Sequence, residues 1–391
     1  MPNQYKEQII TKIDGVLDVL WGISEALFHE PEVAFKEYKA CQLLANALRD
    51  YDFTIETGIG GLETAFRGSY GTDNHPAVAI LAEYDALVEL GHACGHNLIA
   101  AAAIGAGISL SKLTPKLPGR VEVIGTPAEE GGGGKIRLLK AGIFDSIDAA
   151  MMFHPASKNL VLRPSLASAK LKLEFIGKAA HAAAAPEEGI NALDALILTY
   201  NNINAIRPTF GPKDRVAGII VDGGKAANIV PAHSAADFSI RSLTAKRRDV
   251  LVDKVISCAQ SAAQTIGCRL EYKLSPGYRE MVPNKTLAGL FKLNLESLGR
   301  IVSDPDPNER MGSTDMGDVS HVIPAIHPYL AMAPENVAGH TLEFKGYCLS
   351  EAGKSAMLDA AKAMAMTTVD LLTQPDLLSR ARDELLNGEK S

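Results

Sequence analysis

Residues 91–97 read GHACGHN and place one thiol and two imidazoles within five positions. Cys94 and His96 lie one residue apart, so an extended or tightly turned segment can direct both side chains at one point. Thiolate and imidazole are good ligands for zinc and neighbouring transition ions, and ligation keeps a thiol deprotonated near neutral pH. The motif alone fits a metal site, and it equally fits a cysteine buried as a small hydrophobe beside an unrelated histidine.

Two adjacent carboxylates, Glu129 and Glu130, follow an apolar run and precede four glycines in GTPAEEGGGG. Adjacent acids usually lie on a solvated surface. These two stand where a strand is expected to end and a loop to open, which is the usual place for active-site groups in an α/β sheet. One of them can ligate a metal while the other acts as general base on water that the metal activates.

Two further histidines are less informative when each is taken alone. His154 ends an apolar run before Pro155, and His340 follows a glycine in AGHT. Each is readily interpreted as a structural residue. Together with the groups above they provide a thiolate, three imidazoles and two carboxylates at strand ends or loops of one α/β portion, and we predict that this set holds two ions.

The composition bounds the class of protein. A chain of 391 residues with 47% apolar and 22% charged residues is typical of a soluble globular protein with two or more domains. The formal net charge of −7 argues against a nucleic-acid-binding surface. The five cysteines are scattered, and no stretch of about 18 apolar residues or export signal is visible. We therefore expect a cytoplasmic protein with no membrane span.

The first part of the chain predicts an α/β sheet. Apolar residues at helical spacing fill the first 30 positions up to Pro31, and a second helix is expected over 36–49. Apolar runs at 62–67, 77–82 and 121–126 predict strands, with a helix between the last two. This order of strands and helices is that of an α/β domain.

A self-contained β-α-β-β-α-β unit follows, and this is the ferredoxin-like order. Its expected elements are 169–176, 191–207, 216–221, 236–241, 247–266 and 269–273. The unit interrupts the first domain, so we predict domain segments 1–166, 167–281 and 282–391. The last segment would close the first sheet with strands near 325–332.

The chain resembles the aminoacylase and glutamate-carboxypeptidase family of metal-dependent amidohydrolases. The resemblance rests on AEYDAL, GHACGHN, GTPAEEGGGG, MMFHP, GKAAHAAAAP, NIVPAHSAADFSIR, GSTDMGDVS and AGHT, which occur in family order along nearly the whole chain. The aminobenzoyl-glutamate hydrolase and dipeptidase branch is most similar, and the auxin-conjugate hydrolases are also similar. The resemblance implies a zinc-aminopeptidase-like catalytic domain with an inserted ferredoxin-like lid that mediates dimerisation.

By this resemblance, Cys94 bridges two divalent metal ions, for which zinc is expected first and manganese, cobalt or nickel as alternatives. The resemblance also implies the remaining metal ligands, which are His96, Glu130, His154 and His340. Glu129 is implied as the general base. Asp85 is implied as a residue that does not bind the metal itself but orients one of its ligands.

The resemblance also implies residues that bind substrate. His181 matches a lid histidine that reaches the partner subunit's site and stabilises the oxyanion, although a turn histidine is the plain alternative. Asn228 and Arg241 match residues that hold a substrate carboxylate, and a guanidinium suits this task because it donates two parallel hydrogen bonds. The implied substrate is an N-acyl amino acid or dipeptide with a free carboxylate.

Several positions depart from the family or leave a choice open. Asn97 and Glu83 replace residues that are acidic or histidine in relatives, and Cys94 stands where the wider family often has Asp. His327, which precedes Pro328, competes with His340 as the last ligand. Residues 312–315 are expected to shape the wall of the acyl pocket.

Two other functions compete with hydrolysis of such substrates. A binding or regulatory relative that has lost catalysis would be free to lose Glu129, which this chain retains. A metal-dependent aminopeptidase would need an acidic group for the free amine rather than Arg241. The charge of the substrate separates such an aminopeptidase from a hydrolase of substrates with a free carboxylate.

Overall fold

The computed structural model describes residues 2–71, 76–275, 277–304, 306 and 311–388, which form two compact units. Unit 1 comprises Met1–Pro164, Met281–Arg310 and Asp315–Ser391, and unit 2 comprises Ser165–Glu280 with Met311–Thr314. Within these described ranges, no helix combines the length and the apolar sequence needed to cross a membrane.

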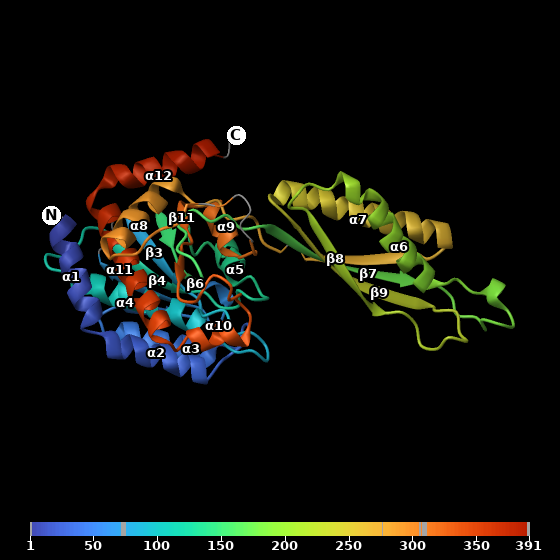
Figure 1. Ribbon diagram of the computed structural model, residues 1–391, viewed down its shortest axis with the longest axis horizontal. Coiled ribbons are helices and arrows are strands. Elements are labelled where there is room, and N and C mark those ends of the chain that lie inside the picture. Colours follow the sequence, from blue (N-terminus) through green and yellow to red (C-terminus); the bar gives the residue numbers. More distant parts are fainter. Residues whose placement is uncertain (1, 72–75, 276, 305, 307–310, 389–391) are drawn as a thin grey trace. The chain divides into compact units, whose positions relative to one another are not determined.

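Unit 1 is built on a six-stranded mixed sheet (Figure 1). Its order is β1-β2-β4-β3-β5-β11, and β3 lies parallel to both of its neighbours. The strands are β1 Thr54–Thr57, β2 Phe66–Gly71, β3 Ala77–Ala82, β4 Arg120–Gly125, β5 Ala149–Met151 and β11 Ala325–Ile326. All six residues of β3 are buried, which explains its continuous apolar sequence.

Two predicted elements of unit 1 differ from the structure. The strand expected over 62–67 begins only at Phe66, because the preceding residues form tight turns, with Leu62 donating to Ile59 and Ala65 donating to Leu62. The apolar run over 325–332 divides between β11 and a separate parallel pair, in which β12 Tyr329–Ala331 lies beside β6 His154–Ala156.

Helices enclose the sheet of unit 1. They are α1 Pro2–Asp14, α2 Leu17–His29, α3 Tyr38–Arg49, α4 His96–Ser111, α5 Gly134–Lys140, α8 Lys285–Ser297, α9 Met316–Ser320, α10 Leu342–Tyr347, α11 Glu351–Thr373 and α12 Pro375–Gly388, with a 3₁₀ turn at Ile59–Gly61. The first 30 residues therefore form two helices rather than one. Small residues let α4 approach its neighbours: a Cβ on Gly105 would lie 2.6 Å from Leu20, and one on Gly107 would lie 2.6 Å from Val123.

Unit 2 confirms the ferredoxin-like prediction. Its elements are β7 Ala167–Ile176, α6 Ala192–Ile206, β8 Arg215–Asp222, β9 His233–Ser242, α7 Ala245–Ile266 and β10 Arg269–Ser275, with 3₁₀ turns at Pro186–Glu188 and Arg207–Thr209. The antiparallel sheet has the order β10-β7-β9-β8. Asn191 and Thr244 cap the two helices by accepting backbone N–H groups of the first turn.

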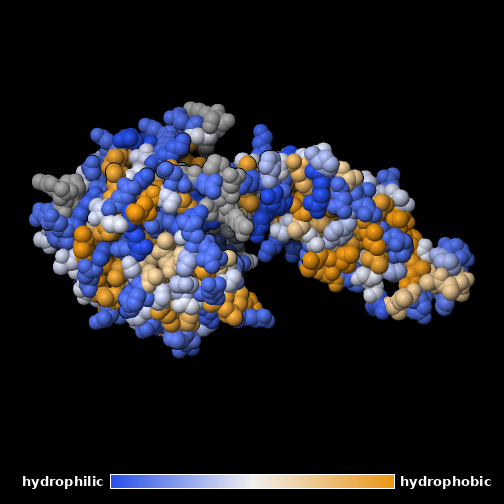
Figure 2. Space-filling view, viewed as in Figure 1, coloured by the Kyte–Doolittle hydropathy of each residue, from blue (hydrophilic) through white to orange (hydrophobic). Residues whose placement is uncertain are grey.

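One face of this sheet is covered and the other is open. Both α6 and α7 lie on the same side of the strands (Figure 1). The edge strand β8 exposes Ile219, Ile220 and Val221, of which Ile219 is 65% exposed. Figure 2 shows hydrophobic residues gathered on the surface of this unit. An exposed apolar edge strand offers unpaired backbone groups to another strand, so it is a natural place for association.

Candidate active site

Cys94 is the centre of a cluster of metal-ligating side chains in unit 1. Its Sγ lies 3.4 Å from His154 Nε2 and 3.3 Å from His340 Nε2. Two groups share this sulfur: Cys94 with His96 and His154, and Cys94 with Glu130 and His340, and in each group the ligand atoms lie within 4.8 Å of one another. Two ligand groups that share one sulfur can hold two ions with the thiolate between them.

The fold brings the ligands together from the ends of elements that are far apart in sequence. His96 is the first residue of α4, and Glu130 lies in the loop after β4. His154 opens β6, where it pairs with Tyr329. Gly95 joins the motif to α4 with a positive φ of 82°, and a Cβ there would lie 2.6 Å from Pro155. Glycine therefore allows Cys94 to approach the strand that carries His154.

Hydrogen bonds fix the tautomers of two of the imidazoles. His96 Nδ1 lies 2.8 Å from the backbone oxygen of Asp85 and 3.1 Å from its Oδ1, and His154 Nδ1 lies 2.7 Å from the backbone oxygen of Pro155. A carbonyl oxygen only accepts, so both Nδ1 atoms donate and both Nε2 atoms keep a lone pair for a metal. Asp85 Oδ2 also accepts the backbone N–H of Glu130 at 3.0 Å, so one carboxylate orients two candidate ligands.

The site's polar atoms fit a pair of cations. His96 Nε2 and Glu130 Oε1 are buried and have no hydrogen bond partner within the described part of the chain. Burial raises the pKa of the Cys94 thiol well above its usual range, and it lowers the pKa of His154 to about 3. A buried polar atom without a partner is costly. Bound cations would satisfy both orphaned atoms and stabilise the thiolate.

Glu129 lies against this cluster. A carboxylate oxygen of Glu129 groups with His96 and Glu130 within 4.8 Å, and its residue is only 9% exposed. Burial raises the pKa of Glu129 well above its usual range, and nearby carboxylates, Glu83 first among them, raise it further. A carboxyl group with a raised pKa can both accept and return a proton near neutral pH.

The residue before Glu129 adopts a rare conformation. Ala128 has a φ of 61°, in the left-handed region that residues other than glycine seldom occupy, and its backbone N–H donates to Glu37 Oε1 at 2.9 Å. The buried Glu37 therefore holds the turn from which Glu129 and Glu130 extend toward the ligand cluster.

The geometry distinguishes between the two competing histidines. His340 Nε2 lies 3.4 Å from Glu130 Oε1, and its backbone N–H donates to Ala93 at 3.0 Å. His327 is buried with its ring edge against the His154 ring, 5.5 Å between centroids, and it belongs to none of the ligand groups that the described residues form. His340 is therefore the better candidate ligand.

Three residues near Glu129 were not predicted as a functional group. Lys135 is completely buried and contacts Glu83 Oε1, and it donates to Asp315 Oδ1 at 2.8 Å. Asp315, expected on the wall of a pocket, is instead buried against this lysine, so that expectation was wrong for this residue. Glu83 was recognised only as a departure from the family. No local pattern reveals a buried lysine, and the four glycines before Lys135 indicated only that a loop opens there.

The remaining predicted residues belong to unit 2. His181 is exposed, and its Nδ1 accepts the backbone N–H groups of Ala183 at 3.2 Å and Ala184 at 3.1 Å. Its Nε2 therefore carries the proton in the neutral ring and can donate it outward. Asn228 lies beside this loop, because its backbone oxygen accepts the N–H of Ala182 at 3.0 Å.

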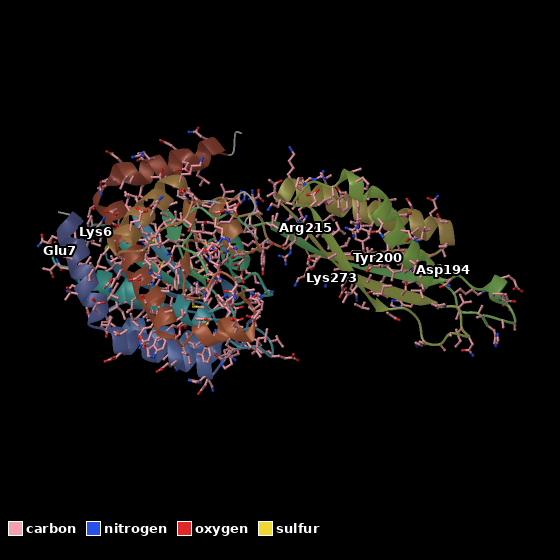
Figure 3. All side chains as sticks on the ribbon, in the orientation of Figure 1. Lys6, Glu7, Asp194, Tyr200, Arg215 and Lys273 are labelled. Atoms are coloured by element: carbon pink, nitrogen blue, oxygen red, sulfur yellow. The ribbon has the colours of Figure 1, made fainter. Side chains whose placement is uncertain are left out.

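Arg241 lies at the other end of the same sheet. It is near the end of β9, opposite Arg215 of β8, whereas Asn228 precedes the start of β9 at His233. Figure 3 shows Arg215 at one end of unit 2 and Asp194, near the start of α6, at the other. The strand from His233 to Arg241 spans roughly 26 Å at about 3.3 Å per residue. One copy of unit 2 therefore does not bring Asn228 and Arg241 to the same carboxylate.

Known proteins with similar sequences and folds define the family. A family model described as a peptidase dimerisation domain matches residues 164–265. The chain is 38% identical to the Xaa-Arg dipeptidase of Mus musculus, over 97% of this chain and 91% of that protein. It is 29% identical to one of the p-aminobenzoyl-glutamate hydrolase proteins of Escherichia coli (strain K12), over 93% of this chain and 91% of that protein.

Solved structures share the fold. A Bacillus subtilis protein described as a dinuclear metal binding peptidase from the M20 family superposes with a TM-score of 0.71 at 18% identity, covering 92% of this chain and 99% of that one. With the ligand groups around Cys94, these similarities define a metal-dependent hydrolase of amide bonds. The chain belongs to the M20 family of amidohydrolases and peptidases, as the recognised motifs indicated.

Proposed function

We propose that this protein hydrolyses the amide bond of a dipeptide or an N-acyl amino acid whose carboxylate is free. The observation that carries the proposal is the pair of ligand groups that share Cys94, with the buried Glu129 directly beside them. The proposed metal ligands are Cys94, His96, Glu130, His154 and His340. Dipeptides are the first substrates to test, because the 38% identical relative is a dipeptidase and the match covers 97% of this chain.

Glu129 is the proposed general base. When bound, the two ions supply Lewis acidity, which polarises the amide carbonyl and makes water a better nucleophile at neutral pH. The Glu129 carboxylate accepts the proton of the attacking water and then donates it to the leaving amine nitrogen. Its burial raises its pKa above the usual range of a glutamate, which favours return of the proton to the amine.

His181 and Arg241 are proposed to bind the substrate at two different points. The neutral His181 ring has its Nε2 proton free to donate to the oxygen that becomes negative during attack, because its Nδ1 is occupied as an acceptor. Arg241 is half-buried, and no hydrogen bond or ion pair engages its guanidinium among the residues that the structure describes. Such a group is available to bind the substrate carboxylate, and Asn228 is proposed to assist at the end of the sheet that carries His181.

We propose a homodimer in which each active site takes residues from both copies. The family match of unit 2 to a peptidase dimerisation domain supports this, as does the exposed apolar edge of β8. The separation of Asn228 from Arg241 supports it further, because a partner copy can supply His181 and Asn228 while the first copy supplies Arg241. We propose that segments 1–166 and 282–391 form the catalytic domain and that 167–281 is the lid.

Zinc is the proposed physiological metal, with manganese, cobalt and nickel as alternatives. The sulfur of Cys94 favours zinc over harder ions, since thiolate is a soft ligand. Five cysteines without a disulfide among them support a reducing compartment, and we propose the cytoplasm.

A substrate panel tests the activity. Metal is removed from the purified protein with a chelator, and the protein is reloaded with zinc, manganese, cobalt or nickel. Amine release is then measured from Xaa-Arg and Xaa-Lys dipeptides, aminobenzoyl-glutamate and N-acetyl amino acids. We expect turnover only in the reloaded protein, and only for substrates with a free carboxylate. Cleavage of amino-acyl anilides, which lack the carboxylate, would identify an aminopeptidase. If no substrate is turned over with any of the metals, the protein is instead a binding or regulatory relative that lacks catalysis.

Subunit complementation tests the shared site. At a substrate concentration near the wild-type KM, His181→Ala and Arg241→Ala are each expected to retain little activity as homodimers, the first through a lower kcat and the second through a higher KM. When the two variants are mixed and allowed to exchange subunits, one site of each heterodimer regains both residues, so roughly a quarter of the wild-type rate is expected. If verified heterodimers stay inactive, His181 and Arg241 contribute to one active site from the same chain.

A further inference from the structure

Lys135 is a buried cation directly behind the proposed base. It lies in the first turn of α5 and is 0% exposed, although lysine is almost never fully buried without a partner. Its ammonium contacts Glu83 Oε1 and donates to Asp315 Oδ1 at 2.8 Å. Its backbone N–H donates to Asp315 Oδ2 at 3.0 Å, so both carboxylate oxygens of Asp315 are bound by this one residue.

Three carboxylates surround this lysine. Glu83, Glu129 and Asp315 are all buried, and one oxygen of each lies within 4.8 Å of the others. We call this group the carboxylate cage. Three converging carboxylates are a ligand set that suits a hard divalent cation, but here an ammonium bonded to two of them takes that place. Burial lowers the pKa of Lys135, but Asp315, Glu83 and Glu129 outweigh it and raise the pKa, so the lysine stays charged.

The glycine run explains how the chain inserts this lysine. Gly133 has a φ of 63°, and Gly134 packs so closely on the Pro127 carbonyl that a Cβ would lie 1.8 Å from its oxygen. A Cβ on Gly132 would lie 2.3 Å from the Phe35 ring. The backbone therefore folds back on itself after Glu130, which only glycine permits, and returns Lys135 beneath the loop that carries Glu129.

We propose that Lys135 is a positioning residue for Glu129: its ammonium fills the carboxylate cage, holds Glu129 beside the metal ligands, and keeps a further divalent ion out of the cage. The proposal rests on the proposed role of Glu129 as the base. A divalent ion in the cage would take Glu129 as a ligand and occupy the lone pairs that must accept the water's proton. The Lys135 ammonium also provides positive charge, but it does not take Glu129 as a metal ligand, because it donates its hydrogen bonds to Glu83 and Asp315. It is also covalently attached to the chain.

Two variants separate positioning from simple charge balance. Lys135→Met removes the ammonium with little change in side-chain length and leaves the cage with excess negative charge. Lys135→Met combined with Asp315→Asn restores the formal charge of the wild-type cage without restoring the ammonium. Each purified protein is compared with the wild type for thermal unfolding, for bound metal per chain, and for kcat and KM on the best substrate of the panel.

We expect kcat of Lys135→Met to fall by about 100-fold, since misplacing a catalytic group by about 1 Å has effects of that size, while KM changes by less than about threefold. The double variant is expected to regain thermal stability but not kcat. In metal titrations Lys135→Met is expected to bind one more divalent ion than the wild type, and the double variant is not. Recovery of kcat in the double variant, or a kcat that never falls, would show that Lys135 only balances charge and would overturn the proposal.

The metal titration also separates this proposal from the proposed function. If the wild type hydrolyses no substrate, the assignment of the base fails, but the cage can still be examined by its ion content. An additional ion in Lys135→Met alone would support the role of the ammonium in excluding metal. Equal ion content in all three proteins would overturn that role, whatever the activity.

Discussion

The two units differ in how their sheets meet solvent, and this separates their tasks. In unit 1 the central strand β3 is buried at every residue, so both faces of the sheet are covered. In unit 2 the helices α6 and α7 lie on one face, and strand β10 is largely exposed. A closed sheet provides a dry interior in which charges act strongly on one another, whereas an open sheet provides surface for a partner.

The units also differ in the charges that they bury. Unit 1 buries Glu83, Asp85, Lys135 and Asp315 almost completely, and all four lie near the proposed metal ligand His96 or the proposed base Glu129. The exposed sheet face and edge of unit 2 instead carry apolar and charged groups in contact with solvent. Buried charges destabilise a fold unless they are paired. Their concentration beside Glu129 supports the proposed catalytic role of unit 1, and unit 2 has no comparable cluster among its described residues.

The largest expected effect is that of removing the base from unit 1. Glu129→Gln should lower kcat by about 10³-fold or more, because the amide cannot accept the water's proton, while two metal ions stay bound. Steady-state kinetics and metal analysis of the reloaded protein measure this. Glu25→Gln, an exposed position on α2, is the control and should be unchanged. Loss of metal from Glu129→Gln would show instead that Glu129 is a ligand.

A charge on the open edge of unit 2 should separate the subunits. Ile219→Lys places an ammonium on the exposed face of β8, and we expect analytical ultracentrifugation to detect monomers. We also expect turnover to fall by about 100-fold, because His181 would no longer reach the proposed site of a partner. Leu293→Lys is the control, since Leu293 is equally exposed on α8 of unit 1. A stable dimer of Ile219→Lys would place the contact elsewhere.

Removing the guanidinium of unit 2 should affect binding more than chemistry. Arg241→Ala is expected to raise KM by about 10- to 100-fold with a smaller change in kcat, because a charge-assisted bond to the substrate carboxylate is lost. Arg241→Lys should recover part of the affinity, since it keeps the charge but loses the planar fork. An unchanged KM in Arg241→Ala would exclude the carboxylate-binding role.

The smallest effect concerns the stability of unit 2. Asp214 accepts from Arg247 Nε at 2.9 Å, from Ser242 at 2.6 Å and from the backbone of Gly211 at 2.7 Å. Burial opposes its charge, but these hydrogen bonds outweigh it and lower the pKa of Asp214. Asp214→Ala should therefore lower the unfolding free energy of unit 2 by about 1–3 kcal/mol at neutral pH.

The pH dependence of this effect has a definite sign. Because the folded-state pKa of Asp214 is lower than the unfolded one, its stabilisation is complete above the unfolded pKa and is lost as the pH falls through the folded pKa. The difference between wild type and Asp214→Ala should shrink in acid-range denaturation experiments. Asp237→Ala, at an exposed position on β9, is the control for loss of a carboxylate from the same unit.

Local patterns predicted much of the fold. The strands over 77–82 and 121–126 agree with β3 and β4 to within a residue, because buried parallel strands are short continuous apolar runs. The ferredoxin-like unit was predicted element by element, since its strands and helices differ clearly in period. The strand over 62–67 was misplaced, because an apolar run can equally fill a tight turn.

The sequence by itself determined which residue types were available and the order of the elements that carry them. Ligand types at strand ends and familiar motifs named Cys94, His96 and Glu130 as candidates, and their chemistry did not depend on knowing the fold. Only the tertiary structure decided which atoms meet: it placed His340 rather than His327 against Cys94, and it buried Lys135 between carboxylates that are 52 and 180 residues away. The physical reason is that pairing of a buried charge depends on contacts between distant segments, and no local pattern of residues records those contacts.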